Sequence, residues 1–485
     1  MSTATATRKV DSLVTTVFDA SGLGDRSYML SDGAVGVVVD PQRDPSPYLA
    51  EARNLGISIT VVLETHIHND YVSGGLALAR ATGASYAIPA GEPVSFSEEA
   101  LALDDGDTML TGLLKVTAVA TAGHTDHHLA YCVSFAADDS GTGDQVVCTG
   151  GSLLANATGR TDLLGPALAE PLARSQWRSV RLLLTTLPKH TRILPTHGFG
   201  SFCSATPSLG ELTAVSTIGH ELEHNPAALL DEDEFVAMLG SETMPIPSYY
   251  RHMAPLNRRG PIAPSFGPVR RLGVDGLGKA FSDDKWVVDL RQRRMFAAGH
   301  VPGTVNLELG ANLTTYLGWM VPWESDLVLL GNDDDEITEA RRLIARIGRD
   351  DLSGAALWSA VGSTLDGTQP GDDPPLRNYP VVSFADLAQA WCKSGAPRPL
   401  VLDVRHRHEW KLGHINGAHL LPLTELAERR QEVPTAGQVW VHCGAGFRAA
   451  VAASLLSGWG VSPVFVDDLW ENATKTDLPI VTAGS

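Results

Sequence analysis

The chain has 485 residues but few cysteines, little positive charge and no long apolar run. Its five cysteines are odd in number and widely spaced, which argues against a disulfide framework and favours a reducing compartment. No segment reaches about 18 consecutive apolar residues, the length that a membrane-spanning helix needs. The N-terminal stretch contains no continuous apolar core of the secretory type. We therefore expect a cytoplasmic protein.

The charge balance excludes two classes of partner. Lysine and arginine number 37 against 56 aspartates and glutamates, so the formal net charge is −19. An excess of negative charge disfavours binding to nucleic acid or to an anionic membrane. Small anionic substrates stay open, because one local basic site is enough for them. A chain of this length is expected to hold about two to four domains.

Two seams rich in proline and glycine divide the chain. We predict linkers at 246–268 and 366–380, where neither a long helix nor a central strand fits the sequence. The linkers separate an N-terminal domain, 1–245, from two shorter pieces, 269–365 and 381–485. The sequence thus predicts three domains.

The two shorter pieces repeat each other. VVDLR in the first and VLDVR in the second are each followed by a Gly-His pair, and the spacing from Asp289 to His300 equals that from Asp403 to His414. Both pieces then continue into an apolar strand and a helical pattern. Strand, loop, strand and helix in this order predict α/β domains with parallel sheets and right-handed crossovers.

The second repeat contains the sharpest motif, HCGAGFRAAVAASLL at 442–456. Cys443 follows an apolar strand, Arg448 lies five residues further on, and an alanine-rich helix begins at once. Gly444 and Gly446 let successive N–H groups turn inward, and the helix N-terminus adds partial positive charge at the same point. The loop therefore favours a thiolate, or a persulfide anion once a sulfur atom is loaded.

This segment resembles the rhodanese family of sulfurtransferases over about residues 381–478. The resemblance makes Cys443 the nucleophile that takes up a sulfane sulfur and Arg448 the arginine on the helix side. The persulfide loop that it implies consists of Gly444, Ala445, Gly446 and Phe447. Four residues separate the cysteine from the arginine, which fits a single sulfur, whereas cysteine phosphatases have five.

The first repeat lacks this chemistry. Its corresponding stretch, DLVLLGNDDDEITEARR, has Gly331 and Asn332 followed by three aspartates where the cysteine would stand. An acidic loop repels a sulfur anion and holds no nucleophile. We therefore expect 269–365 to be a rhodanese-like domain without the active cysteine, with a packing or docking role. Family grounds also give Asp403 and His414 framework roles in the second repeat.

Four motifs of the N-terminal piece carry metal-type residues. They are ETHIHNDYVSGG with His66, His68 and Asp70, TAGHTDHHLAY with His124, CTGGSLLANATGRTDL, and PTHGFGSF with His197. They alternate with strand-like and helical runs, so the piece reads as α/β with many short strands. Histidine and aspartate at the ends of strands are residue types that ligate metal ions.

Together these motifs resemble the metallo-β-lactamase superfamily, and within it the persulfide dioxygenase and glyoxalase II branch, over about residues 13–245. The resemblance implies an αββα sandwich that holds one or two metal ions. The ligands that it implies are His66, His68 and His124 for a first metal, with Asp70 and His197 for a second. Arg160 lies where that branch binds its thiol substrate, and Tyr71 is expected to line the same pocket.

Two positions depart from the family pattern. Tyr71 stands where a histidine is expected, and Gly151 stands where an aspartate would complete the 2-His-1-carboxylate face of ferrous oxygenases. We expect one divalent ion, zinc or iron, because a second ion held only by Asp70 and His197 binds weakly. Neighbouring residues that could substitute as ligands are Asp126, His127, His128 and Asp162.

The remaining cysteines are predicted to be structural. Cys203 reads as a small packed residue, with a pocket thiol that handles sulfur as the alternative. Cys132, Cys148 and Cys392 lie in apolar contexts and are expected in the core.

The sequence leads to three alternative functions. In the first, a Cys443 persulfide transfers sulfur and is coupled to a domain that resembles persulfide dioxygenases, although Gly151 argues against dioxygenase activity. Its partners would be thiosulfate and small, glutathione-like thiols or persulfides. The second is a zinc-dependent thioester hydrolase of the glyoxalase II type, and the third is a non-enzymatic persulfide carrier with a vestigial N-terminal domain. Both a monomer and a homo-oligomer are compatible with the sequence.

Overall fold

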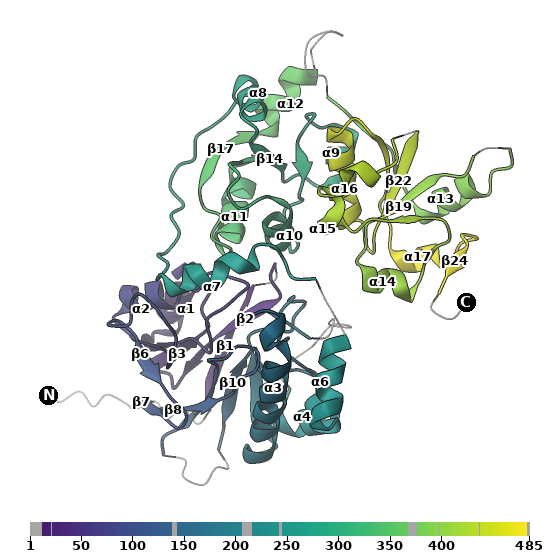
Figure 1. The fold of residues 1–485 in the computed structure, drawn as a ribbon. Coiled ribbons are helices and arrows are strands. Elements are labelled where there is room, and N and C mark those ends of the chain that lie inside the picture. The colour runs from purple at the N-terminus through teal and green to yellow at the C-terminus, as the bar shows by residue number, and fades with distance from the viewer. Residues whose placement is uncertain are drawn as a thin grey trace. The chain divides into compact units, whose positions relative to one another are not determined.

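The computed structural model describes residues 12–20, 22–137, 143–205, 216–241, 245–366, 376–395, 397–435 and 437–482. The chain forms two compact units, Met1–Ser265 with Ala345–Gly348, and Phe266–Ile344 with Arg349–Ser485. Figure 1 shows the first unit mainly in purple to teal and the second in green to yellow. Across the described ranges, no helix is both long and apolar enough to cross a bilayer.

The first unit contains two large mixed sheets. Their strands are β1 (Val14–Ala20), β2 (Asp25–Ser31), β3 (Val35–Val39), β4 (Ser58–Leu63), β5 (Ser85–Pro89), β6 (Leu101–Leu103), β7 (Thr108–Thr111), β8 (Leu114–Ala120), β9 (Leu129–Phe135), β10 (Val146–Gly150) and β13 (Arg192–Pro195). One sheet has the order β1-β2-β3-β4-β5-β6 and the other β13-β10-β9-β8-β7. A separate short pair is formed by β11 (Leu153–Leu154) and β12 (Ala157–Thr158).

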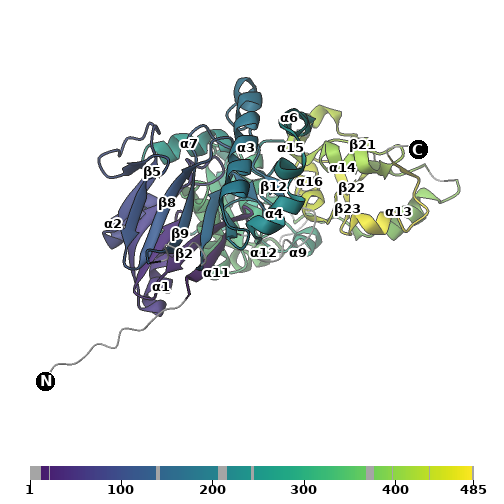
Figure 2. The same cartoon turned by 90° about the horizontal axis from the view of Figure 1, so that it is seen from below.

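Helices cover the outer faces of both sheets, as Figure 2 shows. They are α1 (Ser46–Leu55), α2 (Gly75–Thr82), α3 (Pro166–Thr186), α4 (Ile218–His224), α5 (Pro226–Leu229) and α6 (Glu232–Ser241). The last helix, α7 (Tyr250–Arg258), is bonded through Asn257 to the loop after β4. Side chains alternate between the two faces of a strand. Val37 and Val39 therefore join the core between the sheets, whereas Val38 packs with residues of α1 and α2. The first unit is an αββα sandwich.

The second unit contains two sheets, in each of which all paired strands run parallel. The strands are β14 (Trp286–Asp289), β15 (Val305–Asn306), β16 (Leu327–Gly331), β17 (Leu352–Leu357), β18 (Val381–Val382), β19 (Leu400–Asp403), β21 (His419–Leu420), β22 (Gln438–His442) and β23 (Ser462–Val466). The orders are β15-β14-β16-β17 and β18-β23-β22-β19-β21. A small antiparallel pair joins β20 (His414–Ile415) to β24 (Ile480–Val481).

Helices and one 3₁₀ turn surround these sheets. They are α8 (Val274–Ser282), α9 (Arg293–Ala298), α10 (Leu313–Met320), α11 (Asp334–Ala345), α12 (Trp358–Asp366), α13 (Phe384–Trp391), α14 (Arg407–Leu412), α15 (Leu423–Leu426), η1 (Arg430–Glu432), α16 (Phe447–Gly458) and α17 (Trp470–Ala473). In Figure 1, α16 of the second repeat lies beside α9 of the first repeat. The backbone N–H of Asn306 donates to Ser454 Oγ on α16 (3.0 Å).

The two repeats share one buried frame. In the second, Nη2 of Arg405 lies 2.7 Å from Asp403, and the guanidinium covers the ring of Trp470 at 3.7 Å from its centroid.

The first repeat reproduces these contacts. Arg291 lies 2.7 Å from Asp289 and covers the ring of Trp358 at 3.3 Å. Each aspartate is buried, so the arginine supplies the charge that a buried carboxylate requires. His300 and His414 each place Nδ1 3.1 Å from the carbonyl oxygen four residues earlier.

Two details differ from the sequence predictions. The segment 246–268 contains the helix α7, because Pro255 removes only one N–H donor and the helix keeps a buried side that includes Met253. Cys392 is exposed at the end of α13 and is not in the core. Cys132 and Cys148 are buried, as expected.

Candidate active sites

The loops that follow the strands bring the predicted metal-type residues of the first unit together. His66, His68 and Asp70 follow β4, and His197 follows β13. The ring centroids of His66 and His124 lie 4.9 Å apart, and those of His124 and His197 lie 5.3 Å apart. These side chains are all buried. The sequence motifs therefore converge on one cluster.

His197 is at the centre of this cluster. Its Nδ1 lies 2.8 Å from Oδ1 of Asp25 and 3.2 Å from Oδ2 of Asp70. Its Nε2 lies 3.3 Å from Nε2 of His66. Asp25 opens β2 and does not belong to the predicted ligand set. The histidine thus links two buried carboxylates on one side to a second histidine on the other.

Hydrogen bonds fix which nitrogen of two other histidines carries the proton. Nδ1 of His66 lies 2.9 Å from Thr65 Oγ1, which itself donates to Asp40. Nδ1 of His124 lies 2.8 Å from the carbonyl oxygen of Arg160, which accepts only. Both Nδ1 atoms therefore donate, and both Nε2 atoms keep a lone pair. Within the described residues, Nε2 of His124 has no hydrogen-bond partner.

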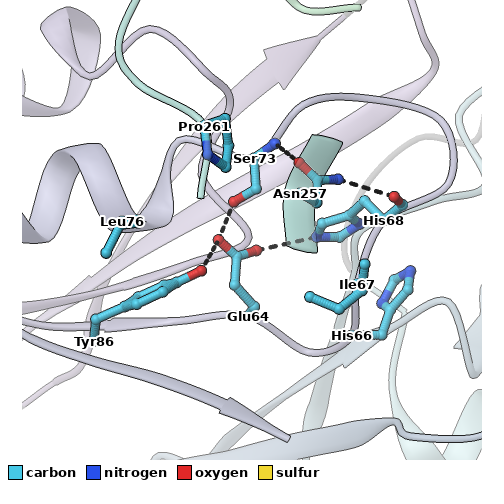
Figure 3. A pocket seen from close by; sticks show the side chains of 9 residues that line it. All are labelled: Glu64, His66, Ile67, His68, Ser73, Leu76, Tyr86, Asn257 and Pro261. Carbon is cyan, nitrogen blue, oxygen red and sulfur yellow. Dashed lines mark hydrogen bonds and ion pairs between the residues drawn. The ribbon is translucent and has the colours of Figure 1, made fainter. Parts of the chain in front are cut away.

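His68 lies differently from the other histidines. Figure 3 shows its ring beside Glu64, which also accepts a hydrogen bond from Ser73. Nε2 of His68 lies 3.2 Å from Glu64, 3.4 Å from Asp40 and 2.9 Å from the hydroxyl of Tyr71. Burial lowers the pKa of His68, but the two carboxylates outweigh it and raise that pKa to about 9. The two acidic side chains therefore favour a protonated His68 before any metal binds.

The other shifts follow from burial and neighbouring charge. Burial, and then the charge of Asp70, raise the pKa of Asp25 to about 7. Burial opposes protonation of His197, but Asp70 and Asp25 outweigh it and raise its pKa well above the ordinary value. Burial, and then the charge of His197, lower the pKa of His124 to about 3. Before any metal binds, these shifts favour a protonated His197 and a neutral His124.

The donors fit a divalent metal ion, but not in the grouping that the family pattern implies. Four groups have possible ligand atoms within 4.8 Å of one another: His66–His68–His197, His124–His197–Cys203, Asp25–Asp70–His197 and Asp40–Glu64–His68. His66, His68 and His124 do not form such a group among the described residues. Three of the four groups contain His197, so the donor set is centred on that residue.

A pocket beside the cluster contains Arg160. The pocket has a volume of about 420 Å³, and its lining includes Thr161, Ser204 and Leu239. The guanidinium of Arg160 makes two hydrogen bonds of 2.7 Å to Asp162. Since the carbonyl of Arg160 also orients His124, one residue connects the pocket to the cluster.

The remaining predicted residues have structural contacts. The hydroxyl of Tyr71 donates to the carbonyl of Asp40 (3.0 Å). Tyr71 is buried with its ring stacked on that of His68, and it does not line the Arg160 pocket. His128 binds Thr121 through Nδ1 and accepts the N–H of Gly151 through Nε2. Across the described ranges, Asp126, His127 and Asp162 belong to none of the ligand groups.

Cys203 is buried against the same cluster. Its Sγ lies 3.7 Å from the hydroxyl of Tyr250, and burial, followed by the charge of Asp70, raises the pKa of its thiol. The thiol is therefore neutral near neutral pH. It belongs to one ligand group with His124 and His197. The packed-residue interpretation fits its burial, and its place beside two histidines makes it part of the cluster.

The loop of the second repeat surrounds the sulfur of Cys443. β22 ends at His442, and α16 begins at Phe447, so the thiol lies in front of a helix N-terminus. The N–H of Gly446 lies 3.2 Å from Sγ, and the φ angle of this glycine is +89°. Cys443 is 2% exposed. The backbone turns inward at the sulfur, as an anion-binding loop requires.

Arg448 is held by a carboxylate from α14. Its Nη1 and Nη2 lie 2.5 and 2.8 Å from the two oxygens of Glu409. Burial raises the pKa of Glu409, but the hydrogen bonds and charge of Arg448 outweigh it and lower that pKa to about 2. Glu409 is absent from the predicted site, although it follows the VLDVR motif closely.

The first repeat contacts this loop directly. The ring centroids of Tyr316 and Phe447 lie 5.3 Å apart. Arg293 donates to Asp467 (2.8 Å), and a Cβ at Gly446 would overlap that carboxylate and lie 3.2 Å from Nε of Arg293. The loop therefore has glycine at 446 for two reasons, its left-handed backbone and the ion pair packed against it.

Comparisons with known proteins agree with these two folds. Residues 15–197 match the metallo-beta-lactamase superfamily, and residues 385–468 match the rhodanese-like domain. A metallo-beta-lactamase crystal structure from Staphylococcus aureus subsp. aureus COL has a TM-score of 0.62 at 24% identity and covers 72% of this chain and 99% of its own. The chain is thus a metallo-β-lactamase superfamily domain followed by a C-terminal rhodanese-like domain. The predicted resemblance and fold class are confirmed.

Curated relatives cover the first of these domains. The mitochondrial persulfide dioxygenase of Homo sapiens is 28% identical over 237 residues, which are 48% of this chain and 83% of that protein. A hydroxyacylglutathione hydrolase of Cereibacter sphaeroides is 34% identical over 175 residues, which are 36% of this chain and 62% of that protein. Both enzymes named here lie in the branch that the motifs indicate.

Proposed function

We propose that the chain transfers sulfane sulfur through a persulfide on Cys443. The observation that carries this proposal is the sulfur itself, buried at the N-terminus of α16 with the N–H of Gly446 at 3.2 Å. Amides and a helix N-terminus stabilise a sulfur anion. Arg448 lies at the same loop as an ion pair with Glu409.

The transfer proceeds in two displacements. The Cys443 thiolate attacks the outer sulfur of thiosulfate, the S–S bond breaks, and sulfite leaves with the electron pair. The terminal sulfur of the persulfide is then attacked by the thiolate of a small thiol. The acceptor leaves as a persulfide and Cys443 returns to the thiolate.

The test compares Cys443→Ser with Cys392→Ser in thiosulfate-dependent sulfur transfer. Cys392 is an exposed cysteine of the same domain, so its serine variant controls for the loss of any thiol. We expect Cys443→Ser to fall to the uncatalysed background and Cys392→Ser to keep the wild-type rate. After wild type is treated with thiosulfate, mass spectrometry should also show one added sulfur atom, and this atom should be on Cys443 alone. Equal rates in Cys443→Ser and wild type would reject the proposal.

We further propose that 269–365 is a rhodanese-like domain that lacks the nucleophile and braces the active loop. The shared Asp–Arg–Trp frame and the parallel strand pattern support the relationship. The contacts of Tyr316 and Arg293 with the second repeat support the bracing role. Residues 366–380 would then be the linker between the two copies.

For the first unit we propose an action on a small, anionic thiol derivative, with a glutathione-like persulfide as substrate. The Arg160 pocket and its link to His124 support this proposal. A divalent ion, zinc or iron, would supply Lewis acidity to a bound substrate or water. Arg160 would bind the anionic end of the substrate, and the carbonyl of Arg160 holds the proton of His124 at Nδ1.

Hydrolysis of a glutathione-derived thioester is the second candidate, and the hydroxyacylglutathione hydrolase relative favours it. Oxygen consumption on adding glutathione persulfide would indicate oxidation. Turnover of a glutathione thioester without oxygen consumption would indicate hydrolysis. Arg160→Met should raise the KM in whichever reaction occurs, with Arg174→Met as the control, because Arg174 lies on exposed ion pairs of α3. If neither reaction occurs while Cys443 stays reactive, the first unit is a scaffold and the chain a persulfide carrier.

A further inference from the structure

Two buried carboxylates share one imidazole in the first unit. Asp25 Oδ1 and Asp70 Oδ2 lie 2.8 and 3.2 Å from Nδ1 of His197. Donor atoms that surround one ion at about 2.1 Å are about 3.0–3.4 Å apart, so the Asp70 separation already matches a shared ion and the Asp25 separation, a hydrogen-bond distance, needs only a small widening. The side chains of all three residues are buried.

A hydrogen bond to His197 does not satisfy this pair. Oδ2 of Asp25 and both carboxylate oxygens of Asp70 have no hydrogen-bond partner among the described residues. Three of the four oxygens are therefore buried without a donor. One imidazole can balance the charge of only one of the two acids, so the other must hold a proton or face a cation. A divalent ion would relieve both carboxylates at once.

The carboxylate that the family pattern expects is also absent from its usual place. Gly151 has no side chain, and a Cβ at that position would overlap Cδ2 of His124. His124 therefore occupies the space that an aspartate at 151 would need. Asp25 approaches the cluster from β2 on the other sheet of the sandwich.

We propose that Asp25, Asp70 and His197 bind a divalent metal ion, with Asp25 as the carboxylate ligand that Gly151 cannot supply. Two carboxylate oxygens and one imidazole nitrogen suit Mn²⁺, Fe²⁺ or Zn²⁺. The nitrogen of His197 that faces the two carboxylates is Nδ1, so this atom would be its ligand. His68 takes no part, because it is engaged by Glu64 and Asp40.

The test measures Mn²⁺ binding to the full-length, metal-stripped chain. Mn²⁺ prefers oxygen and nitrogen ligands over thiols, so Cys443 does not compete, and free Mn²⁺ is counted from its six-line electron paramagnetic resonance signal. We expect one ion per wild-type chain. Asp25→Asn should weaken binding at least about tenfold, since it removes one charged ligand of three.

Asp32→Asn is the matched control. Asp32 is a buried carboxylate beyond the other end of β2. Its Oδ1 accepts the N–H groups of Ala34 and Val35, which asparagine preserves, and its Oδ2 accepts that of Leu113, which asparagine loses without touching the metal cluster. It should bind Mn²⁺ as wild type does. Added Mn²⁺ should also raise the thermal midpoint of wild type and of Asp32→Asn but not of Asp25→Asn.

Two results would overturn the proposal. One is wild-type affinity in a folded Asp25→Asn, and the other is the absence of Mn²⁺ binding by wild type. Folding of each variant is checked by circular dichroism before titration. The measurement needs no sulfur substrate, so either result leaves the role proposed for Cys443 untouched.

Discussion

Neutralising Glu409 by Glu409→Gln should destabilise the second unit by about 3 kcal/mol at pH 7. The pKa of this carboxyl is about 2, against an ordinary value of 4.5, because Arg448 outweighs the effect of burial. Each pKa unit corresponds to about 1.4 kcal/mol, which gives the figure. Since folding lowers the pKa, the contribution is complete above pH 4.5 and is lost as the pH falls to about 2.

Urea unfolding followed by tryptophan fluorescence measures this change. Trp177 is the single tryptophan of the first unit, so the signal reports mainly on the second. Glu425→Gln is the control, because its partners Arg407 and Arg429 are 58% and 30% exposed and each such surface pair contributes about 0–1 kcal/mol. Iodoacetamide should also alkylate Cys443 faster in Glu409→Gln, because the charge of Arg448 is then uncompensated. Equal stability of the two variants would refute the assignment of Glu409.

Two further predictions concern buried positions. Gly151→Ala should destabilise the first unit by about 1–3 kcal/mol in urea unfolding followed by circular dichroism, because its Cβ overlaps His124. Gly240→Ala, where the space is open, should be neutral or stabilising, and the same loss in both variants would contradict the clash. Burial lowers the pKa of His300 to about 4, so the unfolded chain takes up the proton first as the pH falls from 6.5. The decrease in unfolding free energy caused by His300→Gln should therefore be about 3 kcal/mol smaller at pH 4 than at pH 6.5. A decrease that does not change with pH would show that His300 is not buried in its neutral form.

The motifs carried most of what the sequence could predict. Alternating His66 and His68 at a strand end, and Cys443 with Arg448 at a helix start, are local patterns whose chemistry depends on neighbouring residues. The strand-like runs that alternate with the metal-type motifs form β3, β4, β8 and β10, among other strands. These features follow from short stretches of chain, so they can be read without knowing the fold.

Contacts between distant segments were beyond the sequence. Asp25 stands in GDRSYML, a strand without any ligand motif, and reaches His197 only because the N–H of Arg26 bonds the carbonyl of Thr196. Its one signal is a carboxylate at the start of an otherwise buried strand. The contact of His68 with Asp40, which comes from the loop after β3, was likewise not visible in the sequence, whereas its role as a metal ligand stays a prediction.

The predicted linker was also incomplete for this reason. Asn257 of α7 donates to the carbonyls of His68 and Tyr71, both at 2.9 Å, and accepts the N–H of Ser73. A proline-rich segment therefore fixes the turn that carries the histidines. Prolines in the sequence indicate only where regular structure is interrupted locally. The role of this segment depends on Asn257, which contacts a loop that is far away in the sequence.

The paired Asp–Arg–Trp frames separate architecture from reactivity. The frame around Asp289 persists in the copy whose turn reads GNDDDE, so the scaffold tolerates complete replacement of the segment after its central strand. An engineer could therefore transplant HCGAGFR onto β16 and ask whether a second sulfur carrier arises in the same molecule. Such a chimera would show how few amino acids turn a supporting module into a reactive one.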